Sequence, residues 1–158
     1  MFNYIGRMIT DREMALDFTQ EVFLKAYASL KSYRPDFKFT TWLYRIASNY
    51  VIDYWRKKKI TAVSIDQPLN PEEEGSCIQV PDDKPSVIEA LETSELRVRL
   101  EKAMDKLPGP LRELFVWRHV NGLSYEEMAE VKKLPVGTVK NRVFQAKEQI
   151  RRILEEMA

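Results

Sequence analysis

The segment from residue 62 to residue 95 constrains the fold of this chain more than any other. It holds four of the eight prolines, no aromatic residue, and nine acidic residues against one lysine. Such a composition lacks the large apolar side chains that build a core and is typical of a solvated linker. The 158-residue chain is therefore predicted to form two small domains, residues 1–61 and 96–158, each with its own core. Within the linker, Ser86 and Glu89 have capping-box spacing, which indicates a helical pattern from Ser86 onward.

Helical periodicity marks both predicted domains. Residues 11–33 repeat apolar side chains at spacings of three and four, which predicts a long amphipathic helix through Leu16, Phe18, Val22, Phe23, Ala26, Tyr27 and Leu30. Pro35 ends that pattern, and a second helix is predicted over residues 40–59. The second domain is predicted to hold helices that end near Leu107, cover 111–120, begin at Tyr125 and begin near Pro135. No segment alternates as a strand would, so the predicted fold class is all-α.

The distribution of charge and the scarcity of cysteine and histidine limit the classes of function that this chain can have. The first domain has a net charge of +5 (11 basic and 6 acidic residues), the second +4 (13 and 9), and the linker −8. Basic segments rich in aromatic residues are typical of nucleic-acid surfaces. Because Cys77 and His119 are the only residues of their types, the sequence excludes an internal disulfide and a zinc cluster, and we expect no metal and no cofactor. No apolar run approaches the ~20 residues of a membrane span and no signal pattern is present, so we expect a cytoplasmic protein.

Residues 121–153 have the pattern of a helix-turn-helix. Asn121 and Gly122 stop one helix, and Ser124 with Glu127 has the capping-box spacing for the next. Pro135 is suited to the first turn of the last helix. Turns of this kind often have Gly or Asn in a left-handed conformation, and Lys133 would cost about 1–2 kcal/mol if it occupied that position.

The last helix is predicted to have two different faces. At about 100° per residue, one stripe is apolar and predicted to be buried: Val139, Val143, Ala146, Ile150, Ile153 and Leu154. Thr138, Asn141, Gln145 and Glu148 then point outward, with Lys140, Lys147 and Arg142 on the flanks. Short hydrogen-bonding groups between cations suit a helix that reads base edges in the major groove. An ordinary solvated amphipathic helix would show much of the same pattern.

The helix over residues 40–59 also carries two organised faces. Leu43, Ile46, Ala47, Tyr50 and Tyr54 form a core stripe, while Trp42, Arg45, Asn49, Asp53 and Arg56 form a second stripe about 80° wide. Rings interleaved with cations suit single-stranded nucleic acid, whose bases stack on aromatic faces. Packing within a small core is an equal alternative for Trp42 and Asn49. Asp53 is expected to pair with Arg56 or Lys57 along the helix.

These residues resemble a known family, the bacterial RNA polymerase sigma factors of the extracytoplasmic-function (ECF) group. "DFTQEVFLKAYASL" is similar to the family's polymerase-clamp-binding helix, and "FTTWLYRIASNYVIDYWRKKK" to its minus-ten-element helix. "LPGPLRELFVWRHVNGLSYEEMAEVKKLPVGTVKNRVFQAKEQIRRIL" resembles its minus-thirty-five domain. The resemblance implies about one more helical hairpin before Phe2, so we expect the first domain to lack its first helix or helices.

The resemblance also implies roles for particular residues. Polymerase binding would fall to Asp17, Gln20, Glu21 and Phe23. Binding of the minus-ten strand would fall to Tyr33, Phe37, Trp42, Arg45, Asn49, Arg56 and Lys57. The minus-thirty-five duplex would contact Ser124, Tyr125, Thr138, Lys140, Asn141, Arg142, Phe144, Gln145 and Lys147. Leu111, Leu114 and Phe115 would face the polymerase flap, or equally fill the core.

The implied function is that of a non-enzymatic sigma factor. It would direct core RNA polymerase to promoter DNA, read both as duplex and as melted single strand, and an anti-sigma factor is a further partner that the resemblance allows. No membrane partner is expected. The competing hypothesis is a one-component regulator whose helix-turn-helix binds duplex operator DNA, although this leaves the Trp42 to Asn49 stripe without a role. A nuclease using Asp17, Glu21 and Asp53 is disfavoured because nothing in the sequence gathers those carboxylates.

Overall fold

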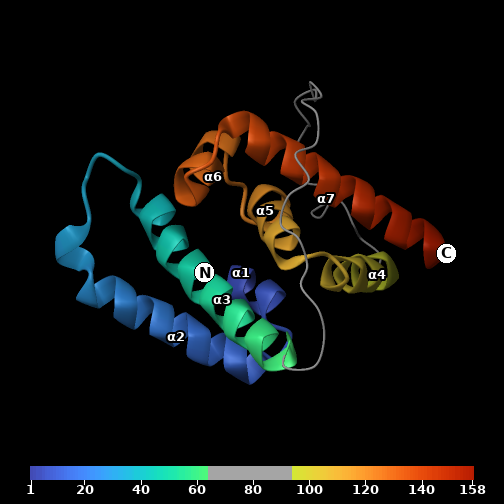
Figure 1. Ribbon diagram of the computed structural model, residues 1–158, viewed down its shortest axis with the longest axis horizontal. Coiled ribbons are helices and arrows are strands. Elements are labelled where there is room, and N and C mark those ends of the chain that lie inside the picture. The colour runs from blue at the N-terminus through green and yellow to red at the C-terminus, as the bar shows by residue number, and fades with distance from the viewer. Residues whose placement is uncertain (64–93) are drawn as a thin grey trace. The chain divides into compact units, whose positions relative to one another are not determined.

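The computed structural model describes residues 1–63 and 94–158, and within these ranges every regular element is a helix. The chain divides into two compact units, residues 1–76 and 77–158 (Figure 1). The predicted all-α fold is thus confirmed. Nearly all of the predicted linker, with its helical pattern from Ser86, lies outside the described residues.

The described residues of the first unit, 1–63, form three α-helices: α1 (Phe2–Met8), α2 (Arg12–Ala28) and α3 (Phe39–Val63), with a 3-10 turn, η1 (Leu30–Ser32), after α2. Asp11 caps α2 by accepting a hydrogen bond from the Met14 amide at 3.0 Å. The helix α1 packs against both α2 and α3, and α2 packs against α3. The core joins all three helices through Tyr4, Ile5, Val22, Ala47 and Val51, each fully buried.

Phe18 links α2 to α3 at the margin of this core. Its ring meets Tyr50 and Tyr54 edge-on, with ring centroids 4.8 and 5.0 Å apart. The predicted α3 core stripe is therefore largely correct: Leu43 and Ala47 are buried, and the two tyrosines are half-buried against Phe18.

The apolar residues of the predicted amphipathic helix at α2 divide into a buried row and an exposed row. Ala15, Val22 and Ala26 do face the core. A second apolar row, which we call the outer row of α2, is exposed and consists of Leu16, Phe23, Leu24 and Tyr27 on α2, together with Leu30 at the start of η1. At about 100° per residue these side chains point away from the Val22 face, so α3 cannot cover both rows. Apolar spacing alone did not distinguish the buried row from the exposed one.

In the second unit, residues 94–158 are described and form four helices: α4 (Ser94–Asp105), α5 (Gly109–His119), α6 (Tyr125–Lys132) and α7 (Val136–Glu156). The long α7 packs against each of the other three. Trp117, Leu114 and Met128 are the largest apolar side chains of this core with almost no exposed surface. The predicted buried stripe of α7 is confirmed for Val139, Val143, Ala146 and Ile150, while Ile153 and Leu154 are half-buried near its end.

The turns of the second unit follow local signals in the sequence. Gly122 ends the α5 region with φ at 69°, a left-handed conformation that glycine adopts without a steric penalty. Ser124 and Glu127 form the predicted capping box, with hydrogen bonds of 3.1 and 2.8 Å. Lys133 occupies the left-handed position of the turn, with φ 54° and ψ 44°. Pro135 is the N-cap of α7, and the helix begins one residue later, at Val136.

Candidate nucleic-acid interface

An aromatic cluster lies where the chain enters α3. The rings of Tyr33, Phe39 and Trp42 are mutually 5.4 to 5.5 Å apart between centroids. The Tyr33 hydroxyl donates to the Phe37 carbonyl at 2.7 Å, which closes the connecting loop. Phe37 and Phe39 are 45% and 46% exposed. Trp42 is half-buried, so the cluster supports its indole from one side and leaves part of it accessible.

The second stripe of α3 continues from this cluster along the helix. Asn49 is exposed, whereas Arg45 is half-buried. Arg56 pairs with Asp53 at 3.6 Å between Nη1 and Oδ1, which confirms the predicted intrahelical partner. Lys57 is exposed beside them. The stripe therefore presents a partly accessible indole, an amide and several cations outside the core of the unit.

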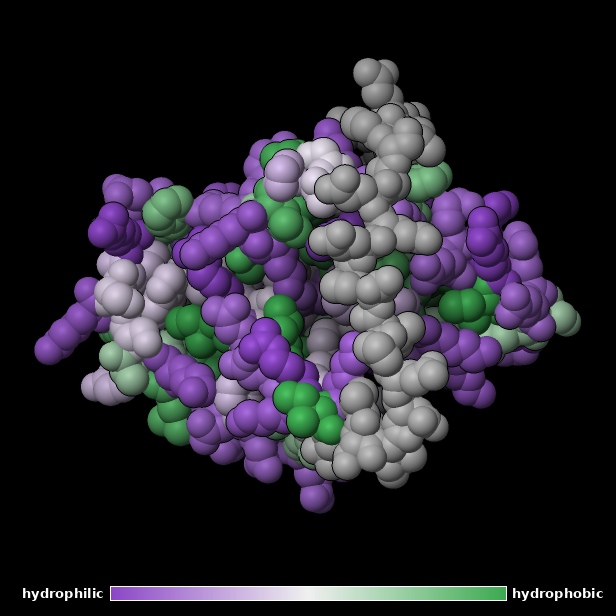
Figure 2. All heavy atoms as spheres, in the orientation of Figure 1, coloured by the Kyte–Doolittle hydropathy of each residue, from purple (hydrophilic) through white to green (hydrophobic). Residues whose placement is uncertain are grey.

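Asp17, Gln20 and Glu21 lie on α2, next to the outer row. All three are exposed, and Phe23 within the row is 50% exposed. Glu21 also influences Tyr50 on α3. Burial of the Tyr50 hydroxyl is the larger cause that raises the pKa of Tyr50, and the negative charge of the Glu21 carboxylate raises it further. In Figure 2 hydrophobic side chains interrupt the hydrophilic surface of the molecule. Uncovered apolar groups beside carboxylates are typical of a protein-binding surface.

The start of α6 gathers two cations over one ring. Arg118 Cζ lies 4.5 Å from the centroid of Tyr125, and Lys140 Nζ lies 5.4 Å from it. Arg118 is further held by donating from Nη1 to the Leu123 carbonyl at 3.2 Å. Across the described residues, no carboxylate pairs with Arg118 or Lys140. Two cations beside the capped N-terminus of α6 make an anion-binding arrangement.

Arg118 was missed by the sequence reasoning. It lies on α5, outside the two helices of the predicted motif, and a turn brings Tyr125 to it. Its spacing of seven residues from Tyr125 gives no helical signal across a turn. The one sequence signal for a role of Arg118 in DNA binding was its position as a basic residue near the end of the helix that precedes the helix-turn-helix.

The predicted reading face of α7 lies outside its core. Thr138, Asn141, Arg142, Phe144 and Gln145 are all half-buried, Lys147 is exposed, and Glu148 accepts a hydrogen bond from Arg151 at 3.0 Å. Ser124, which is half-buried, is occupied in capping α6. The face thus combines amide, hydroxyl and aromatic groups with cations on either side, which suits contact with a DNA groove.

Comparison with known proteins gives the family. Residues 1–60 match Sigma-70 region 2, and residues 97–150 match Sigma-70, region 4. The chain is 37% identical to the ECF RNA polymerase sigma-E factor of Escherichia coli strain K12 over 138 residues, which cover 85% of this chain and 70% of that one. It is an ECF sigma factor. The ECF RNA polymerase sigma factor SigW of Bacillus subtilis strain 168 is similar too, at 34% identity over 151 residues, 96% of this chain and 81% of that one.

Solved structures agree on the fold of this sigma factor. The sigma factor RpoE in complex with the anti-sigma factor NepR from Bartonella quintana matches with a TM-score of 0.71 at 22% identity, covering 98% of this chain and 89% of that one. CnrH in complex with the cytosolic domain of CnrY matches with a TM-score of 0.67 at 21% identity, covering 99% and 82%. Family membership establishes the function of the chain as promoter-directed initiation of transcription.

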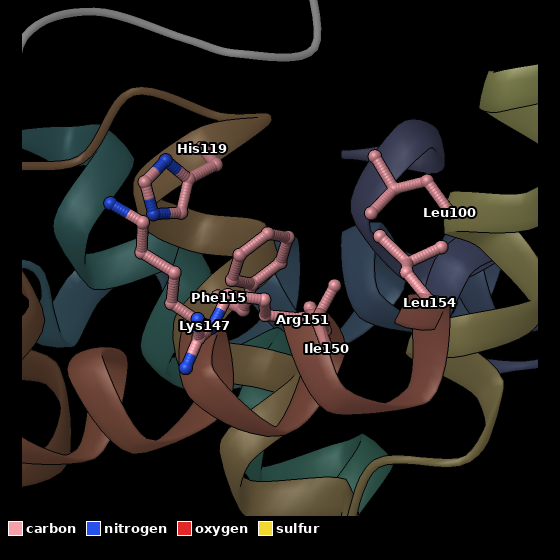
Figure 3. Close-up of a pocket in the computed structure, with 7 residues that line it drawn as sticks. All are labelled: Leu100, Phe115, His119, Lys147, Ile150, Arg151 and Leu154. Carbon is pink, nitrogen blue, oxygen red and sulfur yellow. The ribbon is translucent and has the colours of Figure 1, made fainter. Parts of the chain in front are cut away.

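A pocket of about 160 Å³ opens within the second unit of the sigma factor (Figure 3). Leu100, Phe115, Ile150 and Leu154 give it an apolar lining, while His119, Lys147 and Arg151 add nitrogen-bearing groups. The His119 ring packs on Phe115 with centroids 4.6 Å apart. Leu114, which the family resemblance placed on the polymerase-facing side of its helix together with Phe115, is 1% exposed and belongs to the core. Phe115 lines the pocket. An apolar pocket with cationic groups fits an amphipathic segment that carries acidic residues.

No cluster of three or more histidine, cysteine, aspartate or glutamate side chains that could hold a metal ion occurs in residues 1–63 and 94–158. Among the same residues, no helix is long and apolar enough to span a membrane.

Proposed function

We propose that this sigma factor captures an unpaired minus-ten base on the α3 stripe and reads the minus-thirty-five duplex with α7. The carrying observation is the exposed Asn49 amide on the same face of α3 as Arg45, below a partly accessible Trp42. An amide can bond the edge of a base that has left the duplex, while aromatic groups provide stacking surfaces. Tyr33, Phe37, Arg56 and Lys57 complete this site.

The second unit supplies the duplex contacts in this proposal. Asn141 and Gln145 have the side chains that bond adenine edges, and Lys140, Arg142 and Lys147 reach phosphates from the shoulders of α7. Thr138 and Phe144 add contacts on the same face. The Arg118 and Lys140 pair over Tyr125 holds one phosphate at the start of α6, beside Ser124. This arrangement explains why two like charges are held close to one ring.

Protein partners follow from the apolar surfaces. The outer row of α2, with Asp17, Gln20 and Glu21 beside it, binds core RNA polymerase. The pocket on the second unit takes an apolar segment of the polymerase or of an anti-sigma factor, since the similar sigma factor RpoE from Bartonella quintana is in complex with the anti-sigma factor NepR. Residues 1–61 and 96–158 serve as the two functional domains. The protein has no catalytic activity of its own and works in the cytoplasm, where the polymerase is.

Permanganate footprinting of a promoter tests the proposal. Holoenzyme is assembled from core RNA polymerase and the full chain, and the reactivity of minus-ten thymines measures strand opening. Asn49→Ala should reduce the opening equilibrium roughly 5- to 150-fold, because loss of a base-edge contact costs about 1–3 kcal/mol. Binding to the minus-thirty-five duplex should stay unchanged.

The matched control is Asn3→Ala, the same chemical change at an exposed position of α1 in the same unit. It should open the promoter as the wild type does. If Asn49→Ala holoenzyme opens the promoter as well as this control, the strand-capture role of the α3 stripe is wrong.

A further inference from the structure

One charged group of the second unit is enclosed completely. The Glu113 side chain on α5 has 0% exposure, and its Oε2 pairs with Nζ of Lys132, whose side chain is 14% exposed. Lys132 is the last residue of α6. The pair therefore joins the middle of α5 to the point where α6 ends.

Trp117 forms the third member of this contact. It lies one helical turn after Glu113 on α5, so the two side chains share a face. The Lys132 ammonium lies 5.1 Å from the centroid of the Trp117 ring, which is fully buried. An ammonium group between a carboxylate and the face of an indole ring is attracted to both. Because both attractions are electrostatic and act in a largely desolvated environment, together they fix the position of the ammonium group.

The chain between this anchor and α7 has little freedom. Lys133 is left-handed, the Leu134 amide donates to the Ala129 carbonyl at 3.0 Å, and Pro135 has φ fixed at −58°. Three constrained residues thus transmit the position of the α6 end to Val136, where α7 begins. Gln145 lies nine residues further along, or about 13 Å at about 1.5 Å per residue. A tilt of about 5° at the start would move it by about 1 Å, enough to spoil a hydrogen bond to a base.

We propose that Lys132 is a positioning residue for minus-thirty-five recognition: its contact with Glu113 and Trp117 sets where α7 starts and thereby aligns Asn141 and Gln145 with the base edges. The inference rests on the proposed function of α7. Burial of an ion pair is not needed for stability, since well-packed apolar residues of similar volume often serve equally well. The ion pair instead holds the end of α6 against α5 in one defined arrangement, from which the constrained turn leads to α7.

The test is the double variant Glu113→Met/Lys132→Met in full-length sigma factor bound to core RNA polymerase. It removes one negative and one positive charge, so the net charge of the protein is unchanged and non-specific DNA binding is matched. It also leaves no uncompensated buried charge, so the unit should fold. The probe is the duplex that wild-type holoenzyme selects from a pool randomised at the minus-thirty-five position, compared with single-base variants of it.

We expect the double variant to discriminate between these duplexes about 3- to 10-fold less well, while its affinity for non-specific DNA changes less than about twofold. Lys132→Arg keeps the charge and should keep discrimination near the wild-type level. If the double variant does not fold at the assay temperature, Glu113→Gln/Lys132→Gln is measured in its place, with the same expectation.

The outcomes separate this inference from the function on which it rests. Undiminished discrimination by a folded double variant would overturn the positioning role, because a contact that only stabilises the unit changes the melting temperature and not the choice of base. Loss of discrimination in Lys132→Arg as severe as in the double variant would overturn it as well. Failure of the wild-type holoenzyme to select any duplex would overturn duplex reading by α7 and this inference with it.

Discussion

Substitution of Lys133 by glycine should stabilise the second unit, because this residue alone among the described non-glycine residues has a positive φ. Its φ of 54° and ψ of 44° bring the β-carbon close to the following carbonyl oxygen. The side chain is exposed, and within the described parts of the chain it makes no hydrogen bond or ion pair that could offset the strain. The two hydrogen bonds of its amide, to the Ala129 and Glu130 carbonyls, do not depend on the side chain.

The size of the effect follows from two opposing terms. Relief of the left-handed strain contributes about 1–2 kcal/mol. The greater freedom of glycine in the unfolded chain removes roughly 0.5–1 kcal/mol of that gain. The net stabilisation is then about 0.5–1 kcal/mol, which corresponds to a rise in melting temperature of about 2–8 °C for a unit of this size.

Fluorescence of Trp117 provides the assay. Trp117 is buried in the second unit, and a Trp42→Phe/Trp55→Phe background leaves it as the sole tryptophan of the chain. Thermal and urea unfolding of Lys133→Gly are compared with those of Lys133→Ala. Both variants lose the same charge and the same side chain, but alanine keeps the β-carbon that causes the strain.

The difference between the two variants decides the matter. Glycine should unfold at a higher temperature and at a higher urea concentration than alanine, with similar dependence on denaturant. Equal stability of the two variants, or a glycine variant below the wild type, would show that no strain is stored at this turn.

Three further predictions concern other parts of the molecule. Gly122→Ala should destabilise the second unit by about 1–2 kcal/mol in the same unfolding assay, because its φ of 69° is strained for any residue with a β-carbon. The added β-carbon would meet no atom within 4 Å, so the loss would come from backbone strain and not from a steric clash with a neighbour. Lys140→Ala should weaken binding of holoenzyme to all duplexes alike and reduce the salt dependence by about one unit, whereas Asn141→Ala should relax preference at one base position; titrations at several salt concentrations that show the reverse pattern would contradict the assignment. Phe23→Ser on the outer row of α2 should weaken association with core RNA polymerase at least tenfold in a pull-down while leaving the helical circular dichroism signal intact, because the 50% exposed ring contributes little to the core of the unit.

Local sequence signals predicted the local structure well. The capping box of Ser124 and Glu127 and the buried stripe of α7 each depend on residues within one or two turns of one another. The same holds for Asp53 and Arg56 on α3. Such features are set by backbone geometry and spacing, which the sequence displays directly.

Features that depend on distant parts of the chain escaped prediction. The helix α1 is only seven residues long, too short for a clear period, and its Tyr4 and Ile5 are buried because α2 and α3 enclose them. The outer row of α2 has the same spacing as a core stripe, and which row α3 covers is decided by packing. The contacts of Arg118 with Tyr125 and of Glu113 with Lys132 join residues from different helices, and no spacing rule connects them.

The outer row of α2 has a practical consequence for anyone who engineers this protein. Tyr27 and Leu24 are 80% and 62% exposed, so a redesign for higher yield or longer storage would choose them first for replacement by polar residues. Such a variant would keep its fold and become easier to handle, but it would give up the surface by which we expect it to join the transcription machinery. Improved behaviour in the test tube is therefore a poor guide to fitness here, and screens for solubility should be paired with a screen for transcription.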